Sequence, residues 1–364
     1  MRDGLAVDKW IFFAVAGLLA LGVTMVLSTS YLYSQERFSD GTYFFRKQLM
    51  AIGAGSAGLV ICSLLPPVTY RRLAYPLLAL TFVILVLVLI PGIGVARGGA
   101  RRWLTLSGFA FQPAELAKLA IVFYLAHSMT RKEESIQTFS IGVLPHLLVG
   151  SVFLGLLLLE PDFGTALILG VLLYMMLFIG GARVSHLMAT GLMALPVLIY
   201  IMLSAEYRLR RLLSFMDPWR DASSSGFQVV QSLIAFGSGQ LWGRGLGESR
   251  QKLFYLPEAH TDFVFSVIGE ELGLLGALVV LALFGIIIVR GLRLTARIEE
   301  PFEQYLAFGL TILLGLQALI HMGVVMGMMP TKGLVLPFIS YGGSAMVINL
   351  TEAGILLGLS RRRL

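Results

Sequence analysis

The chain has 364 residues, of which 57% are hydrophobic and only 13% are charged. Its charged residues cluster between long apolar stretches, a pattern typical of a polytopic membrane protein. The net charge of +7 does not indicate nucleic-acid binding, because no basic patch is interleaved with the aromatic residues that such binding needs. Cys62 is the only cysteine, which excludes an internal disulfide and a multi-cysteine metal site.

Ten apolar stretches are long enough to cross a bilayer, which takes about 20 residues of helix. They lie at 10–30, 47–65, 73–92, 114–130, 141–159, 164–181, 184–203, 263–289, 304–329 and 336–359. The sequence therefore predicts an all-α polytopic membrane protein in which residues 1–364 form a single membrane domain. Arg2 and Lys9 precede the first span and no small-residue cleavage site follows it, so we expect a retained anchor.

An even number of spans places both termini on the same side of the membrane. Basic residues are denser in the loops on that side, among them Arg71, Arg131, Arg290 and the run at 361–363. Because cytoplasmic loops carry an excess of Lys and Arg, we expect both termini to be cytoplasmic.

The loop between the third and fourth spans, on the predicted outer face, holds Arg97, Gly98, Arg101 and Arg102. Glycines let the backbone approach a ligand, and guanidinium groups can bind phosphate through two parallel hydrogen bonds. Arg101 and Arg102 are therefore candidate anion-binding residues. Anchoring in lipid headgroups is the alternative for such a loop.

The fourth span carries a charge pair near its outer end. Pro113 favours a helix start, and the i, i+3 spacing places Glu115 and Lys118 on neighbouring turns of one face. Ionisable groups in hydrocarbon are costly unless they are paired or hydrated. The two residues are therefore either a structural ion pair or part of a polar cavity shared with Asp262, in which Glu115 holds Lys118 or a cation.

The longest loop, 204–262, is too long for a simple connector, so we expect a structured extracytoplasmic loop. It begins with Leu209, Leu212 and Leu213 at helical spacing among arginines, which is typical of a helix lying in the headgroup layer. Glycines between 237 and 247 lack the Lys-Ser/Thr ending of a nucleotide loop, and we predict no nucleotide site there.

Glu258, His260 and Asp262 lie at the end of this loop, at the mouth of the next span. A carboxylate there is partly desolvated, so its pKa should rise and Asp262 could serve as a general base. Capping of the following helix is the alternative for Asp262. His260 could orient the acid or contact a phosphate, or could have a structural role.

Four further acidic residues have simpler interpretations. Glu160 and Asp162 flank a proline in the turn between the fifth and sixth spans, where helix capping is the favoured role. Glu270 and Glu271 belong to a stretch longer than the hydrocarbon thickness, so we expect them close to the outer interface.

Together with the ten spans, five motifs resemble the SEDS family (shape, elongation, division and sporulation). They are RRW at 101–103, FQPAELAK at 111–118, EPDFGT at 160–165, LPEAHTDF at 256–263 and PFISYGGS at 337–344. The resemblance implies a peptidoglycan glycosyltransferase that polymerises lipid II, the undecaprenyl-pyrophosphate-linked disaccharide pentapeptide. Within these motifs we predict that Glu258, His260 and Ser340 contact substrate.

The resemblance also implies a mechanism. The family's catalytic aspartate falls on Asp262, which would deprotonate the acceptor sugar's 4-hydroxyl in a single displacement that inverts the donor's anomeric carbon. Arg101, Arg102 and Lys118 would neutralise the pyrophosphate leaving group. A divalent cation, Mg²⁺ or Mn²⁺, would suit carboxylates such as Glu115. No organic cofactor is expected.

Residues 207–212, 217–219 and 330–333 resemble division members typified by FtsW more than elongation members typified by RodA. This implies a bacterial inner-membrane protein at the division septum, working with a class B penicillin-binding protein, which is a transpeptidase, and with other divisome proteins. Glycines on the eighth and ninth spans, such as Gly276 and Gly309, allow close helix approach, and we expect the partner to dock there.

Two other functions fit parts of the pattern. A lipid II flippase would also have ten spans and charges at membrane depth, although no inverted repeat is evident. A scaffold that recruits the transpeptidase is the third possibility. A base at the outer helix mouth favours the polymerase, since neither alternative needs one.

Overall fold

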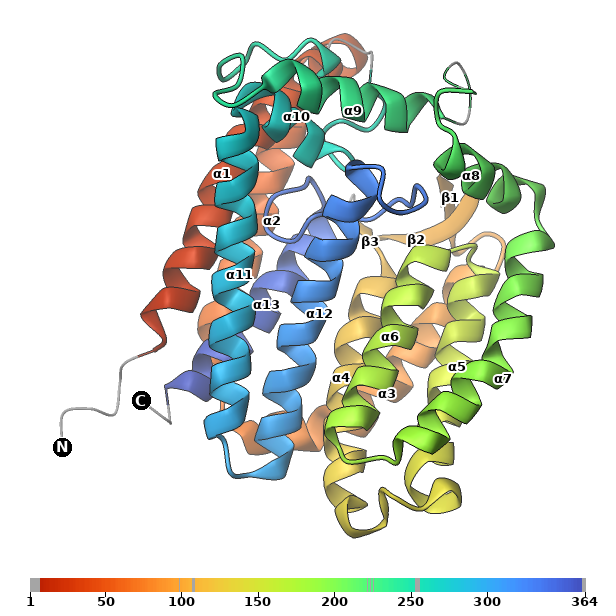
Figure 1. Ribbon diagram of the computed structural model, residues 1–364. Coiled ribbons are helices and arrows are strands. Elements are labelled where there is room, and N and C mark those ends of the chain that lie inside the picture. Colours follow the sequence, from red (N-terminus) through yellow and green to blue (C-terminus); the bar gives the residue numbers. More distant parts are fainter. Residues whose placement is uncertain are drawn as a thin grey trace, which may run out of the picture.

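The computed structural model describes residues 7–97, 99–106, 109–220, 222, 224, 226–252 and 256–361. Arg2, Gly98, Arg362 and Arg363, which entered the topology and loop predictions, lie outside these residues. Long helices dominate the fold (Figure 1). The ten that correspond to the predicted spans are α1 (Lys9–Phe38), α2 (Tyr43–Leu64), α3 (Pro67–Leu89), α4 (Pro113–Arg131), α5 (Leu144–Leu159), α6 (Phe163–Ile179), α7 (Val184–Leu203), α11 (Gly273–Arg297), α12 (Pro301–Val325) and α13 (Gly343–Ser360).

Among the described helices, eight are long and apolar enough to cross a membrane. The fourth of these, Phe139–Leu159, consists of α5 and the short π-helix Phe139–Val143 that leads into it. The other two predicted spans correspond to α6, which has 17 residues, and to α4, which holds Glu115 and Lys118. Each predicted span therefore has a helix, and the polytopic helical fold class is confirmed.

The helices differ greatly in how much of their surface the bundle covers. In its most apolar window, α12 is 83% buried, and it packs against α4, α6, α11 and α13. The corresponding window of α7 is only 6% buried, and α7 packs against α6 and α8 at the rim. Exposed leucine and valine side chains on rim helices suit contact with lipid chains.

Both ends of the described chain lie at the same end of the bundle (Figure 1). The backbone N–H of Asp8 donates to the Ser360 hydroxyl at 3.0 Å, and Arg290 pairs with the Asp8 carboxylate at 2.6 Å. The same carboxylate caps α1 by accepting from the Trp10 and Ile11 amides. This cluster ties α1, α11 and α13 together, and the connections that hold α8, α9 and α10 lie at the opposite end (Figure 1).

Residues 95–111 form a small sheet where the sequence indicated only a loop. Strands β1 (Val95–Arg97), β2 (Ala100–Leu106) and β3 (Phe109–Phe111) pair antiparallel in the order β1-β2-β3. The register shifts between Val95, which pairs with Trp103, and Ala96, which pairs with Arg101, so Arg102 lies at a bulge in β2.

Two predicted spans have different boundaries in the structure. The stretch 263–289 breaks at Leu272 into α10 (Val264–Glu271) and α11. Gly273 has φ +67°, and a Cβ there would lie 2.6 Å from the Leu241 carbonyl oxygen, so the outer loop occupies the space that a straight helix would need. The stretch 336–359 becomes helical only at Gly343, because residues 326–342 form an irregular loop that folds over the outer end.

Loop 204–262 folds onto the outer end, as predicted. It contains α8 (Glu206–Met216) and α9 (Phe227–Gly239), and α9 packs against α10 and α12. Buried Glu270 holds the loop by accepting hydrogen bonds from the Ser249 hydroxyl (2.5 Å) and the Arg250 amide (3.1 Å). Glu271 pairs with Lys252 at 3.3 Å. These two glutamates, expected near the interface, therefore anchor the loop to α10.

Candidate functional site

Asp262 lies in a tight turn immediately before α10. The amides of Thr261 and Asp262 both donate to the Glu258 carbonyl at 3.1 Å, and Glu258 adopts a left-handed φ of 56°. Phe263 is the N-cap of α10, whose amides receive no side-chain cap. The capping alternative for Asp262 is therefore wrong, and its half-buried carboxyl remains available for other interactions.

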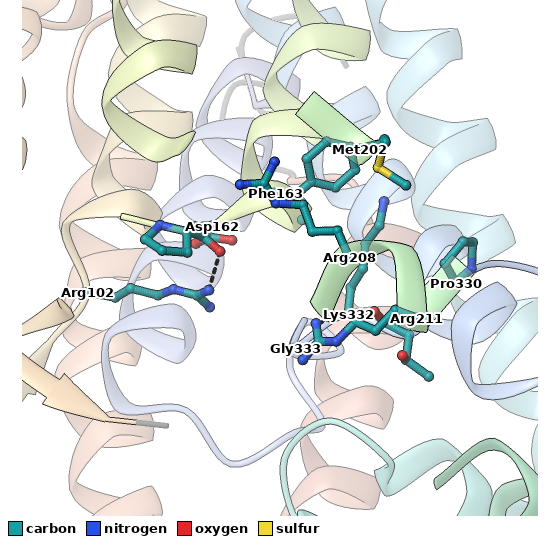
Figure 2. A pocket seen from close by; sticks show the side chains of 12 residues that line it. Arg102, Asp162, Phe163, Met202, Arg208, Arg211, Pro330, Lys332 and Gly333 are labelled. Atoms are coloured by element: carbon teal, nitrogen blue, oxygen red, sulfur yellow. Dashed lines mark hydrogen bonds between the residues drawn. The ribbon is translucent and has the colours of Figure 1, made fainter. Parts of the chain in front are cut away.

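A pocket that is open to solvent lies beside this turn (Figure 2). Its walls come from β2, the α5–α6 turn, the outer end of α7, α8 and the loop before α13. The lining residues are Arg102, Pro161, Asp162, Phe163, Gly164, Met202, Arg208, Arg211, Pro330, Thr331, Lys332 and Gly333.

Asp262 adjoins the cavity through Gly333. A Cβ built on Gly333 would lie 3.1 Å from the Asp262 Oδ2 atom. Burial, together with the Glu258 carboxylate, raises the pKa of the Asp262 carboxyl to about 7 against the opposing charges of Arg211 and Arg102. A carboxyl that titrates near neutral pH is well suited to act as a general base.

Four cationic side chains surround the cavity. Arg102 donates to the carbonyl oxygens of Glu160 (2.9 Å) and Pro161, which fixes its guanidinium beside the α5–α6 turn. Arg208 donates to the Ile201 carbonyl, and Arg211 to the Thr331 carbonyl at 3.5 Å. These bonds cross-link the walls while leaving positive charge at the cavity, as an anionic ligand requires.

Lys332 is the fourth cation. Its Nζ atom lies 5.1 Å from the centre of the Phe163 ring, and both side chains line the pocket (Figure 2). Burial lowers the pKa of Lys332 to about 8, against the opposing effect of the Asp162 carboxylate. The ammonium is thus charged at neutral pH but close to its titration.

The acidic residues of the α5–α6 turn have different surroundings. Asp162 caps α6, as predicted, by accepting from the Thr165 amide (3.1 Å) and hydroxyl (2.9 Å). Glu160 is fully buried, and burial together with Asp162 raises the pKa of its carboxyl to about 8. Asp162 is therefore the negative group on the wall of an otherwise cationic cavity.

Of the predicted phosphate-binding residues, the structure places only Arg102 at the cavity. Arg101 is exposed and does not line the cavity. Lys118 is 2% exposed inside the bundle, where its Nζ donates to Glu115 Oε1 (2.9 Å) and Gln317 Oε1 (2.5 Å). The hypothesis that Glu115 and Lys118 share a cavity with Asp262 is therefore corrected: they form a buried ion pair within α4, and Lys118 also donates to Gln317 of α12.

The remaining predicted residues shape the turn that holds Asp262. His260 is buried against three aromatic rings, burial lowers the pKa of its imidazole, and its carbonyl accepts from the Tyr341 amide at 2.9 Å. The Ser340 hydroxyl donates to the Thr261 carbonyl (2.7 Å) and accepts from the Leu336 amide (2.8 Å). Glu258 is exposed. His260 and Ser340 therefore hold the turn in place, and Glu258 faces solvent.

Residues 9–364 match the sequence profile of the FtsW/RodA/SpoVE family, whose members are described as cell cycle proteins. The chain belongs to this family. A probable peptidoglycan glycosyltransferase FtsW from Geobacter sulfurreducens is 45% identical over 98% of this chain and 95% of that protein. Stage V sporulation protein E of Bacillus subtilis is 39% identical over 94% of each chain.

Solved structures of the family share the fold. A chain from a peptidoglycan synthase complex, described as coordinating polymerization and crosslinking, superimposes with a TM-score of 0.79 and 32% identity and covers 99% of both chains. The crystal structure of the rod shape determining protein RodA from Thermus thermophilus gives a TM-score of 0.71 with 30% identity, covering 99% of this chain and 98% of that one.

Of the four cations that line the cavity, only Arg102 was among the first phosphate candidates from the sequence. Arg208 and Arg211 belonged to the predicted headgroup-layer helix and were the next candidates for the phosphate site, and Lys332 was only part of a motif that marks the division branch. The available signal was a lysine directly before a glycine in a polar break between two spans, since a cation at such a break has to be hydrated, paired or bound to a ligand.

A divalent cation bound by the protein alone would need several ligand side chains close together. The described residues contain no group of three or more His, Cys, Asp or Glu side chains placed to hold one metal ion. A site made by the protein alone therefore does not fit, and the mechanism below uses only this chain's own residues.

Proposed function

We propose that this chain is a peptidoglycan glycosyltransferase that polymerises lipid II into glycan strands for septal cell-wall synthesis. The observation that carries the proposal is the position of Asp262, a carboxyl whose pKa is raised to about 7, at the edge of a cavity that holds four cations. The similarity to proteins named peptidoglycan glycosyltransferases supports the substrate class.

In this mechanism the cavity binds the donor's pyrophosphate. Arg102, Arg211 and Lys332 reach the cavity from three different elements, so they can contact several phosphate oxygens at once. Negative charge develops on the pyrophosphate as the bond from the anomeric carbon to oxygen breaks. Cations that are already fixed in place stabilise this charge without reorganising, which lowers the barrier.

Asp262 acts on the acceptor. Its carboxylate accepts the proton of the sugar 4-hydroxyl while the hydroxyl oxygen forms the new bond to the anomeric carbon. The lipid pyrophosphate leaves from the opposite face, and the configuration of that carbon inverts. Gly333 lies beside Asp262 and also lines the pyrophosphate site. The loop that holds Gly333 can therefore position the proton transfer and the departure of the leaving group close together.

The cellular setting belongs to the same proposal. Both termini lie at one end of the bundle and the Asp262 loop lies at the other, which supports cytoplasmic termini in the bacterial inner membrane (Figure 1). In this proposal the protein acts at the septum with other divisome proteins. A divalent cation, Mg²⁺ or Mn²⁺, would arrive with the substrate pyrophosphate, since such ions are often held by substrate phosphates and few carboxylates.

A class B penicillin-binding protein is the proposed partner, and the difference in burial between α11 and α12 supports one docking face for it. α12, the predicted ninth span, is covered by other helices, whereas α11 exposes Leu278 and Leu281. We therefore assign the docking face to α11 alone. Cysteines at 278 and 281, in a Cys62→Ser background, should crosslink to the partner's membrane span, and cysteines at Gly309 and Gly315 of α12 should not.

The function is tested with purified full-length chain, alone and with its partner, incubated with labelled lipid II. We expect polymer from the wild type and none from Asp262→Asn. Lipid II moved across proteoliposomes without polymer would establish the flippase instead. Wild-type polymer yield from Asp262→Asn would refute the catalytic assignment while leaving the enzyme class intact.

A further inference from the structure

Six rings form a continuous row from the outer ends of α1 and α2 to the turn that holds Asp262. Phe38 stacks on Tyr43 with centroids 4.1 Å apart, and Phe44 lies 5.6 Å from Phe38. Phe44 also lies 5.1 Å from the His260 ring. The members of this aromatic row are Tyr33, Phe38, Tyr43, Phe44, His260 and Tyr341.

The row is exposed at one end and buried at the other. Phe38 is 41% exposed and Tyr43 is partly exposed, whereas His260 is buried. Two cations lie over its rings: Lys47 Nζ is 4.5 Å from the centre of Tyr43, and the Arg37 guanidinium is 5.8 Å from that of Tyr33. The row therefore offers apolar ring surface edged with positive charge.

The short connection between α1 and α2 holds the exposed end in one arrangement. The Gly41 amide donates to the Gln35 side-chain oxygen at 2.9 Å, and the Ser39 amide to the Gln35 carbonyl at 3.0 Å. Asp40 accepts from Thr42 and pairs with Arg46. A surface fixed in this way loses little conformational entropy when a ligand binds.

Interfacial anchoring does not account for the whole row. Aromatic residues that anchor a protein in headgroups lie around the bundle at one depth. This row instead runs inward and ends on His260, two residues before Asp262 and bonded through its carbonyl to the Tyr341 amide. The row therefore leads toward the turn that holds the proposed base, Asp262.

We propose that the aromatic row binds the glycan strand, as the surface along which acceptor sugars and the growing polymer lie. The inference rests on the proposed function and assigns the acceptor side of that site. A pyranose ring presents C–H groups on a face that packs against aromatic rings, while its hydroxyl groups stay hydrated. Lys47 and Arg37 complement the carboxylates of peptides attached to the strand.

The two ligands then reach Asp262 from different elements. The lipid pyrophosphate lies among β2, α8 and the loop at 330–333, and the uncharged sugars lie along α1 and α2. A strand held on the row stays bound between successive couplings, so the row sets how many sugars are added before release.

The test compares Phe38→Ala and Tyr43→Ala with Trp242→Ala, which removes an outer aromatic that is 80% exposed and lies outside the row. Purified full-length variants with the partner receive lipid II, and the rate of first coupling and the polymer length are measured. Losing one ring contact should weaken strand retention about fivefold. We expect shorter polymers from both row variants and normal lengths from Trp242→Ala.

Unchanged length in both row variants, or equal shortening in Trp242→Ala, would overturn the inference. Absence of polymer from the wild type would instead refute the proposed function. A second measurement covers variants that fold poorly: binding of a soluble, uncrosslinked glycan fragment without lipid to full-length Asp262→Asn. In the Asp262→Asn background, a second substitution Lys47→Gln should weaken binding of the fragment, and Tyr43→Phe should preserve it. Equal binding by Asp262→Asn and by both double variants would also overturn the inference.

Discussion

Gly333 and Asp262 lie in contact although they are far apart in the sequence: a Cβ at residue 333 would lie 3.1 Å from Asp262 Oδ2. The loop before α13 therefore forms one side of the base's surroundings. Because Gly333 also lines the cavity, the pair joins the proposed base to the proposed pyrophosphate site.

Gly333→Ala should impair polymerisation with little effect on folding. The added methyl group would crowd the Asp262 carboxyl, and misplacing a catalytic group by about 1 Å can slow an enzyme roughly a hundredfold. Gly343→Ala is the matched control, because a Cβ at Gly343 meets no atom within 4 Å. Equal polymer yields from the two variants would show that the contact does not matter.

The pH dependence of polymerisation should be bell-shaped. Asp262 must be deprotonated to accept a proton, so activity should rise through about pH 7, and Lys332 must be charged, so activity should fall above about pH 8. Lys332→Arg keeps its charge at all these pH values. We expect this variant to lose the falling limb in initial-rate measurements; a falling limb that persists would assign that limb to another group.

Asp262 should also cost stability at neutral and higher pH. Its pKa is raised to about 7 in the folded chain from an ordinary value of 3.8. The folded state therefore binds the proton more tightly, and the stability linked to Asp262 is present below about pH 4 and is lost as pH rises through about 7. Asp262→Asn should then unfold at a higher temperature than wild type at pH 8, with a smaller advantage at pH 5. A lower unfolding temperature at pH 8 would contradict this.

The sequence predicted the helices well and the cavity only in part. Apolar runs revealed each span, because burial in lipid requires them. The break at Gly273 could not be predicted, since apolar residues continue through it and its cause is contact with Leu241 of the outer loop. Likewise, spacing correctly paired Glu115 with Lys118, but depth within the bundle depends on Gln317 and the packing of α12.

The assignment of the two neighbouring arginines depended on an element that was not predicted. Without β2, nothing in the sequence distinguishes Arg101 from Arg102; in the fold Arg102 lies at a bulge and bonds to the α5–α6 turn, whereas Arg101 is exposed. Asp262 was a candidate from the sequence because an acid at the mouth of an apolar span is informative by itself. Lys332 was overlooked because its position beside Phe163 arises only from folding of the loop before α13.

Arg102→Ala and Arg101→Ala should therefore differ, although the residues are adjacent. Arg102 lines the cavity and bonds to the α5–α6 turn, so its loss should slow turnover roughly a hundredfold if it stabilises leaving-group charge. Arg101 is exposed, and its loss should leave turnover close to wild type. Polymerisation rates of the two variants at saturating lipid II test this difference. Equal losses of rate would mean that positive charge near the membrane surface matters and that its position in the cavity does not.

Lys118 should act through folding, since it lies in the bundle and not in the cavity. Lys118→Met would leave the Glu115 carboxylate buried without its partner, and breaking a buried pair in this way costs about 3 kcal/mol or more. Removing both charges, with Lys118→Met and Glu115→Gln, should recover much of the loss. Thermal unfolding of the purified variants measures this directly, and polymer formed per folded molecule should stay within a few-fold of wild type in the double variant. A double variant that is as stable as wild type but inactive would return Lys118 and Glu115 to the catalytic machinery.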